Sequence, residues 1–482
     1  MEALWDDFAT AQNTCNGYLL ATTISPEAPA TDPARLYNFN RGTNAYSLQT
    51  DLRYKLQYNP SLHLEKKEAA AWHEVFTAFY AFTGKLLAAE EAQAASRPRE
   101  ADWSSVYDSW KEVLSAVYRG YSCNVFEAWT IPCLYVVGKY LRIFAIKADE
   151  QAAASQRDSG LAFGELQEED AFGAASKNEK LEDAARQINR IFALCLGDRS
   201  PLEDSRKWAL YYTANLLFKT YFRLNSIPLS KNILRSLRAS ASDTLELSAY
   251  PRAHQVTFKY YSGVIAFLEE DYASAEELLT FAYESCERRA TRNLELILMY
   301  LIPTKMLTAH RLPTRQLLQT SPTLDRLFSP LCTAIKRADL RAFNAALEAG
   351  EDEFVKRRIY LTLERGRDIL LRNLFRKVFI AGEVEDAKVD GGGVGAVAKR
   401  TRIPVREIAA ALRMAGATEI DDGEGGVDTD EVECLVANAI YKDSNLQKLT
   451  ICCEQSHMKG YIARDRGIVV LSKTGAFPGT GV

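Results

Sequence analysis

The chain has 482 residues, of which 47% are hydrophobic and 25% charged. This length exceeds one ordinary compact core and predicts two or three units or an extended solenoid. The net charge of −4 indicates no class of partner. No apolar run of about 18 uncharged residues occurs, which argues against a transmembrane helix. The acidic N-terminus is unlike a secretory signal. The nine cysteines form no CxxC pair, which favours reduced thiols in the cytosol or nucleus.

Residues 1–65 form an N-terminal segment of short helical stretches interrupted by turn signals such as Asp32-Pro33. From Lys66 the pattern becomes helical, since large apolar residues recur every three or four positions: Trp72, Phe76, Phe79, Tyr80 and Leu87. Similar amphipathic segments follow at 103–120 and 127–149. We therefore expect a helical-repeat domain at 66–250.

Residues 151–178 are rich in Ala, Ser, Gly and acids, which predicts a mobile acidic loop within that domain. Helical periodicity resumes near Lys180 and continues to Gly382 in segments separated by short breaks. A chain of antiparallel helices of this kind predicts a mainly α fold with an α-solenoid, and we assign 251–382 to its second part.

One helix pair can be tested against a repeat template. Gly263, Ala275 and Ala282 have the spacing of the small residues in a tetratricopeptide-like hairpin, where two helices cross closely. Glu287 stands where a closing proline is expected. The pattern therefore predicts a degenerate TPR-like repeat.

The character of the sequence changes after Gly382, where a Gly-rich stretch leads into a basic segment. Residues 404–415 and 428–441 are predicted helices, with Pro404 in a first turn and acids at the start of the second helix. A β pattern follows at 460–462 and 468–471, and we expect notable β structure only in the last 40 or so residues. Helices followed by a β-hairpin predict a winged helix at 383–475 and a tail at 476–482.

No catalytic, metal or cofactor motif is apparent. The five histidines lack metal-ligand spacing, no GxSxG occurs, and the acids at 419–433 lack the spacing of a calcium loop. The Gly-rich run at 391–395 lacks the Lys-Ser/Thr of a phosphate loop, which favours a flexible insertion. We therefore expect no enzyme activity and no cofactor.

Two basic clusters are more informative. Residues 206–259 hold nine lysines and arginines against two acids. Some of them share helical faces and predict either a solvated face or a docking surface for an acidic partner: Lys219, Arg223, Lys231, Arg235 and Arg238.

The second cluster surrounds the predicted winged helix. Its cations could contact nucleic-acid phosphates or only keep the surface soluble: Lys399, Arg400, Arg402, Lys459, Arg464, Arg466 and Lys473. The last predicted helix begins with acids, among them Asp430 and Glu433. Because these acids would repel DNA, sequence-specific reading of the major groove is not expected.

Several separated blocks resemble one PCI protein family in that family's order. They are WALYYTANLLFKTYFRLNSIPLSKNILRSL at 208–237, KYYSGVIAFLEEDYASAEELLTFAYESC at 259–286, LILMYLIPTKML at 296–307, DEVECLVANAIY at 430–441 and KGYIARDRGIVVLSK at 459–473. The family contains the twelfth-subunit-like protein of the COP-nine signalosome and its relative in the nuclear transcription-and-export complex. The resemblance covers 180–480, and the CLGDRSPLEDSRKW block is similar to the fungal branch.

This resemblance implies a scaffold without enzyme activity that pairs with a larger PCI protein and a short acidic proteasome-lid-type protein. The assembled pair would bind RNA or DNA and act in the nucleus, in transcription, splicing or mRNA export. Contact with the PCI partner is expected through the wing strands, at Tyr461, Ile462, Val469 and Val470. A structural role in a deneddylase, without nucleic acid, is the alternative. Insertions at 386–401 and 442–456 depart from the family pattern.

Overall fold

The computed structural model describes residues 2–58, 62–95, 97, 100–158, 178–382, 401–416, 429–441, 458–472 and 475–478. The chain divides into two compact units, Met1–Tyr261 (unit 1) and Ser262–Val482 (unit 2), which we describe separately. The division falls inside α12 (Arg252–Leu268), whereas the sequence suggested a boundary after residue 250. Apart from three short strands near the C-terminus, the regular elements of the described residues are helical, which confirms the mainly α fold.

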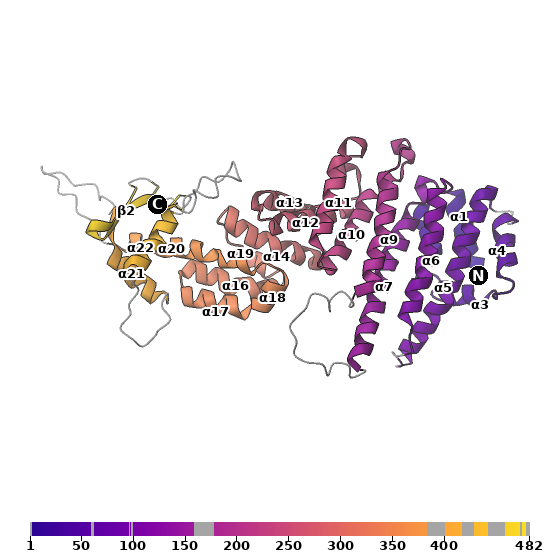
Figure 1. The fold of residues 1–482 in the computed structure, drawn as a ribbon, viewed down its shortest axis with the longest axis horizontal. Helices are drawn as coiled ribbons and strands as arrows, with labels where there is room; N and C mark the ends of the chain where they lie inside the picture. Colours follow the sequence, from indigo (N-terminus) through magenta and orange to yellow (C-terminus); the bar gives the residue numbers. More distant parts are fainter. Residues whose placement is uncertain are drawn as a thin grey trace. The chain divides into compact units, whose positions relative to one another are not determined.

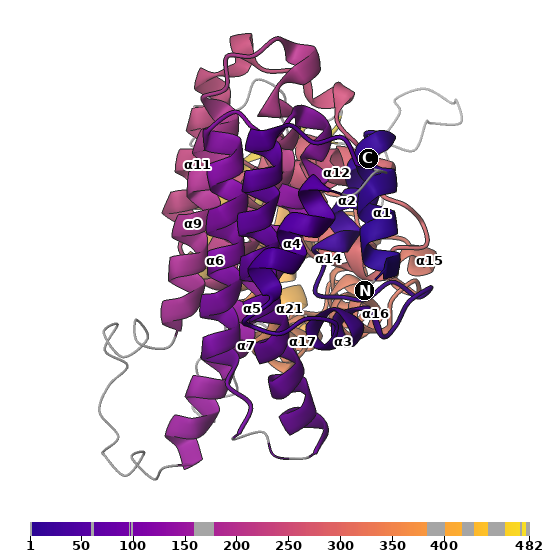
Figure 2. The ribbon, with the colours of Figure 1, turned by 90° about the vertical axis from the view of Figure 1, so that its right-hand side faces the viewer.

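Unit 1 is a row of packed helices in which α5 packs on α6, α6 on α7, and α7 on α9 (Figures 1 and 2). Its α-helices are α1 (Glu2–Asn13), α2 (Gly17–Thr23), α3 (Arg35–Arg41), α4 (Leu48–Gln57), α5 (Lys66–Ala94), α6 (Trp103–Ser122), α7 (Pro132–Asp158), α9 (Glu179–Leu196), α10 (Leu210–Arg223), α11 (Ile227–Ala239) and the start of α12. Short 3-10 turns join them at Ala128–Thr130, Leu202–Asp204, Arg206–Ala209 (η4), Ala241–Asp243 and Leu247–Ala249.

Aromatic side chains form the core of this unit. Trp72 and Phe76, which the periodicity placed on one face of α5, are both fully buried. The ring of Phe8 in α1 lies 5.3 Å from that of Trp72 and 5.2 Å from that of Phe76. The N-terminal segment is therefore anchored in the core of unit 1, because its aromatic residues bury apolar area against α5.

Helix α7 continues to Asp158, well beyond the end expected at 149. Of the acidic loop expected at 151–178, residues 159–177 lie outside the described residues. The stretch Ala128–Ser155 is long and apolar enough to cross a membrane by length and composition alone, and it is 56% buried. It packs between α6 and α9, as the core helix of a soluble protein also would.

A buried ion pair fixes the connection between α9 and α10. The Asp198 carboxylate accepts hydrogen bonds from the Ser205 hydroxyl (2.9 Å), the Arg206 backbone N–H (2.7 Å) and the Arg206 guanidinium (2.9 Å). That guanidinium also donates to the carbonyl of Tyr121 at the end of α6, over 2.6 Å. These bonds hold the pKa of Asp198 well below its usual range, although burial opposes them. Three helices are thereby joined at one point.

Unit 2 continues with α13 (Tyr272–Ser285), α14 (Thr291–Thr308), α15 (Arg315–Leu318), α16 (Pro322–Arg337), α17 (Leu340–Ala349), α18 (Glu351–Lys356), α19 (Tyr360–Glu364) and α20 (Gly366–Ala381). The close crossing expected at Gly263 is present, since a Cβ at this position would lie 2.8 Å from the Leu279 side chain. Ala275 and Ala282 are fully buried in α13. The small residues therefore mark a TPR-like helix pair.

A winged-helix module follows, with α21 (Val405–Met414), α22 (Thr429–Tyr441) and an antiparallel sheet in the order β1-β3-β2. Strands β2 (Gly460–Ala463) and β3 (Ile468–Leu471) form the predicted hairpin around the turn Arg464–Arg466. The hairpin lies in the last 40 or so residues, as expected for the notable β structure, whereas the short strand β1 (Arg402–Pro404) was not predicted. Three residues are too few to show an alternating pattern, and β1 is defined by its pairing with β3. Pro404 therefore ends a strand and precedes α21.

The module is joined to the helices of unit 2. The backbone N–H groups of Leu340 and Arg341 both donate to the Ala415 carbonyl, over 3.0 and 3.1 Å, which links the start of α17 to the end of α21. Phe477, from the segment expected to be a tail, is fully buried and its ring lies 5.8 Å from that of Phe379. The residues 475–478 thus belong to the packed module.

We predict that Asp198→Asn destabilises unit 1 by about 3 to 5 kcal/mol, because it leaves Arg206 without its charged partner in a mostly buried site. Denaturant unfolding at pH 7 measures the change. Because the folded-state pKa is lowered, this stabilisation is present above pH 4 and is lost as the pH falls toward the folded-state pKa. The control is Glu100→Gln, which breaks an exposed pair with Arg97 and should cost under about 1 kcal/mol. Equal effects of the two variants would contradict the central role of Asp198.

Candidate functional site

The residues expected to contact the PCI partner lie on two opposite faces of the winged-helix sheet. Cross-strand partners point to the same face, so Arg402, Val470 and Tyr461 form one row across the sheet. Tyr461 is 57% exposed, which makes this row the outer face. Ile403, Val469 and Ile462 form the row on the opposite face, where Val469 is 1% exposed. The Tyr461 and Val470 side chains thus lie on the outer face, whereas the Val469 side chain packs the module itself.

Strand β2 pairs with β3 on one side only, so it is an edge strand of the three-stranded sheet. An edge strand presents backbone N–H and C=O groups that a partner can pair with. The exposed ring of Tyr461 lies on this strand. Docking of a partner here would therefore use both the backbone of β2 and the outer row.

Arg464 was expected to contact nucleic-acid phosphates. In the structure it forms ion pairs with α22, the helix whose acidic start was expected to repel DNA. Its guanidinium lies 2.9 Å from Asp430 and 3.3 Å from Glu433, both in the first two turns of α22. The acids at the start of α22 are thus partly neutralised by the wing, and Arg464 offers less net charge than the sequence suggested. Sequence reasoning treated these groups separately because they lie 34 residues apart.

The other expected nucleic-acid contacts are placed as follows. Arg402, Lys459 and Arg466 are exposed around the sheet. The remaining three, Lys399, Arg400 and Lys473, lie outside the described residues. Of the expected contacts, the described part of the module therefore presents three exposed cations besides Arg464, and Arg406 and Arg413 of α21 are exposed as well.

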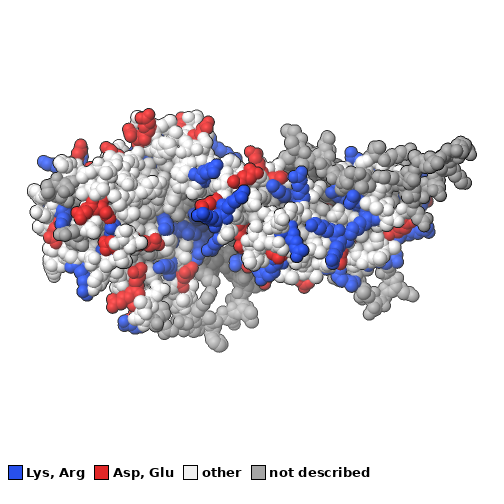
Figure 3. All heavy atoms as spheres, turned by 180° about the vertical axis from the view of Figure 1, so that it is seen from behind, with Lys and Arg blue, Asp and Glu red and all other residues white. Residues whose placement is uncertain are grey.

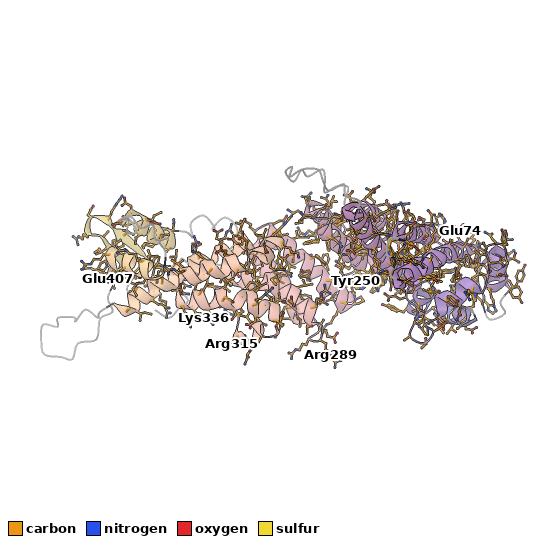
Figure 4. The ribbon with its side chains drawn as sticks, turned by 90° about the horizontal axis from the view of Figure 1, so that it is seen from below. Glu74, Tyr250, Arg289, Arg315, Lys336 and Glu407 are labelled. Atoms are coloured by element: carbon orange, nitrogen blue, oxygen red, sulfur yellow. The ribbon has the colours of Figure 1, made fainter. Side chains whose placement is uncertain are left out.

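A further basic surface lies on unit 2 and was not identified from the sequence. Residues 288–341 hold ten lysines and arginines against three acids, a signal that a count like that made for 206–259 would have found. Lys377 of α20 donates to the Arg337 carbonyl over 2.7 Å, which brings the end of α16 beside α20. Lys and Arg side chains are frequent on the face of unit 2 in Figure 3, and Figure 4 shows Arg289 and Arg315 projecting outward.

The basic stretch at 206–259 is less positive at the surface than its residue count suggests. Arg206 pairs with Asp198, and Lys207 is 8% exposed and donates to the Asp243 carbonyl over 2.6 Å. Arg223 pairs with Glu150 of α7 over 2.6 Å. Arg206, Lys207 and Arg223 therefore have partners within unit 1.

The five cations expected to bind an acidic partner lie on two surfaces. Lys231, Arg235 and Arg238 lie on the face of α11 opposite its buried residues, Ser230, Ile233 and Leu237. Lys219 and Arg223 belong to the preceding helix α10, where Arg223 turns toward α7. Burial and the neighbouring Arg142 guanidinium lower the pKa of Lys219. The outer face of α11 is the more solvated of the two surfaces.

Among the residues that the structure describes, no group of three or more His, Cys, Asp or Glu side chains could hold a metal ion. The thiols of Cys133, Cys195 and Cys332 are buried, and burial raises the pKa of each. A raised pKa favours the unreactive thiol form over the nucleophilic thiolate. These three cysteines are therefore packing residues.

We predict that Arg464→Glu lowers the melting temperature of the chain more than Arg466→Glu does. The first variant places a third carboxylate beside Asp430 and Glu433, whereas Arg466 is exposed in the same turn. The expected difference is about 1 kcal/mol, which thermal unfolding at low salt resolves. If the two variants melt at the same temperature, Arg464 does not hold the wing to α22.

Comparison with known proteins completes the assignment. No family model matches the chain. A Neurospora crassa protein named Protein CSN12 homolog is 51% identical over 484 residues, which cover 100% of both chains. A protein of the same name from Schizosaccharomyces pombe is 36% identical and covers 79% of each chain. PCI domain-containing protein 2 of Danio rerio is 32% identical over 78% of this chain and 80% of its own. Together with the helical repeats and the winged-helix module, these relatives show that the chain belongs to the CSN12 homologue family of PCI-type proteins, in its fungal branch.

Proposed function

We propose that this chain is a non-catalytic scaffold in a nuclear complex that acts in transcription-coupled mRNA processing, splicing or export. In this proposal it pairs with a larger PCI-domain protein, holds a short acidic proteasome-lid-type protein, and contributes to a surface for RNA or DNA. The observation that supports the proposal is the winged-helix module, whose outer row joins an exposed aromatic residue, Tyr461, to a cation, Arg402. One face of one sheet can thus serve partner and nucleic acid together.

The acidic partner is proposed to dock on the cationic face of α11, with Lys219 and Arg223 of α10 nearby in the sequence. The α11 cations project from the solvated side of an amphipathic helix, so their charges face solvent and not the core. Such surfaces attract an oppositely charged partner over distances of about 10 Å at 0.1 M salt. This long-range attraction favours rapid association.

Nucleic-acid binding is proposed to be weak and tolerant of sequence. The described residues of the module present five exposed cations besides Arg464, namely Arg402, Arg406, Arg413, Lys459 and Arg466, and so few phosphate contacts give modest, salt-dependent affinity. The basic helices of unit 2 add cations at residues 288–341. Sequence reading by an inserted helix is not part of this proposal, because α22 begins with acids that Arg464 already engages.

An accessory structural subunit of the COP-nine signalosome, without a nucleic-acid role, is the second candidate, and the name CSN12 homolog of the relatives favours it. Mass spectrometry of the native complex separates the two. A small assembly with one large PCI protein and one short acidic chain supports the first. A ring of many PCI and MPN subunits would contradict it and support the second.

We predict that the triple variant Lys231→Glu, Arg235→Glu and Arg238→Glu weakens association with the acidic partner. The loss should be larger at low salt, where charge attraction is screened least. A pull-down at two salt concentrations measures it. The matched control reverses three exposed cations of α5, Lys66, Lys67 and Lys85, and should leave binding unchanged. Equal binding of both variants would remove α11 from the interface.

We predict that Lys459→Glu with Arg466→Glu lowers the RNA affinity of the purified heterodimer by about tenfold, roughly 1.4 kcal/mol. The salt dependence should also become shallower, because fewer counterions are released. Filter binding of single-stranded RNA at two salt concentrations provides both values. Arg464 is left intact because it also holds α22. Unchanged affinity with an unchanged salt slope would show that the wing does not touch nucleic acid.

A further inference from the structure

A cluster of cations lies inside unit 1 where α7, α10 and α12 meet. The Arg142 guanidinium of α7 donates to the Lys219 carbonyl of α10 over 3.3 Å. The neighbouring Arg223 lies one helical turn after Lys219, and His254 lies on α12. Burial, and then the charge of Lys219, lowers the pKa of His254. Burial also lowers the pKa of Arg142, where Tyr261 opposes the shift and Arg223 adds to it. The side chains of Arg142, Lys219, Arg223 and His254 are thus close enough for their positive charges to repel one another, and burial strengthens this repulsion.

The three helices supply few acids to balance these charges. The described sequences of α10 and α12 contain no Asp or Glu, and α7 carries acids only at Asp149, Glu150 and Asp158. Asp149 accepts the backbone N–H groups of Lys180 and Leu181 at the start of α9, and Glu150 pairs with Arg223. Arg142, Lys219 and Arg223 against Glu150 leave a net charge of about +2, with Arg142 as the half-buried member of the group.

Several buried polar atoms of the same cluster have no hydrogen-bond partner among the described residues. They are Arg142 Nε, His254 Nδ1 and the side-chain oxygen of Asn215, whose side chain is 5% exposed. Asn215 uses its amide nitrogen to donate to the His254 carbonyl over 2.9 Å. The His254 ring is held edge-on against the stacked rings of Tyr135 and Tyr212, at 5.6 and 5.3 Å. The neighbouring rings therefore hold His254 in place. Its Nδ1 atom, like Arg142 Nε, has no hydrogen-bond partner and lies close to positive charge that no acid balances.

We propose that Arg142, Lys219 and His254 form a binding site for a phosphoryl group, reached from solvent past the exposed Lys219. A phosphate monoester carries a charge of about −1.5 to −2 at pH 7, close to the uncompensated charge of the cluster. A single carboxylate would leave about half of that charge. Arginine also matches phosphate geometry through its several N–H donors. The site is distinct from the outer face of α11 and does not depend on the function proposed above.

The test is thermal unfolding of the full chain in potassium phosphate against potassium chloride at matched ionic strength, with O-phosphoserine and inorganic phosphate as separate arms. A ligand that binds only the folded state raises the melting temperature as its concentration rises. Wild type should show this rise. Arg142→Gln and Lys219→Gln should each weaken binding by tenfold or more, whereas Lys219→Arg should retain it. The control Arg235→Gln removes one exposed cation of α11 and should respond like wild type.

Each outcome decides the proposal. Without ligand, Lys219→Gln should melt no lower than wild type, because it removes one of two neighbouring like charges. A lower melting temperature together with unchanged phosphate binding would make Lys219 a packing residue and overturn the site. The same rise in all variants would mean a general salt effect, with the same consequence. A response to inorganic phosphate alone would assign a free anion, and one to O-phosphoserine a phosphorylated residue. If a ten-residue glutamate peptide binds through Arg142 and Lys219 while neither phosphate does, the cluster belongs to the acidic partner and the phosphate site is refuted.

Discussion

The Asp198 network is the interaction on which the arrangement of unit 1 depends. By bonding to the backbone and side chain of Arg206, the carboxylate fixes the turn between α9 and α10, and through Arg206 it reaches the end of α6. Helix α10 starts at Leu210, directly after the η4 segment that contains Arg206. The direction of α10 then determines that Lys219 and Arg223 face α7. One buried charge therefore positions a cationic cluster some way along the next helix.

This arrangement explains why the net charge of the sequence stretch 206–259 exceeds the charge that is exposed for binding a partner. The same basic stretch holds cations that stabilise the fold, such as Arg206 and Lys207, and cations on a solvated face, such as Arg235 and Arg238. A third group is the pair Arg142 and Lys219, in which the Arg142 charge adds to burial in lowering the pKa of Lys219. Only the second group acts as a simple electrostatic surface.

Much of the fold follows from patterns that are local in sequence. The spacing of Trp72, Phe76 and Phe79 gave α5 its buried face, and the small residue Gly263 marked a close helix crossing. Proline and acids located the starts of α21 and α22 within one or two residues. What the sequence could not provide depends on distant partners. Strand β1 exists through pairing with β3, Arg464 is neutralised from α22, and Arg142 matters because α10 folds beside it. For the candidate sites, the residue types were predictable but their grouping was not, because grouping is set by tertiary packing.

A substitution of Gly460 in strand β2 would have a genetic effect out of proportion to its size. A Cβ at this position would lie 2.4 Å from the Val470 carbonyl oxygen, so any other residue pushes β2 away from the strand that carries it. A single missense allele here would disperse the outer row of Arg402, Val470 and Tyr461 while leaving every charged residue of the module in place. Such an allele would behave genetically as a loss of the whole wing surface. Second-site suppressors should therefore be substitutions that make β3 side chains smaller, and not substitutions at the cations.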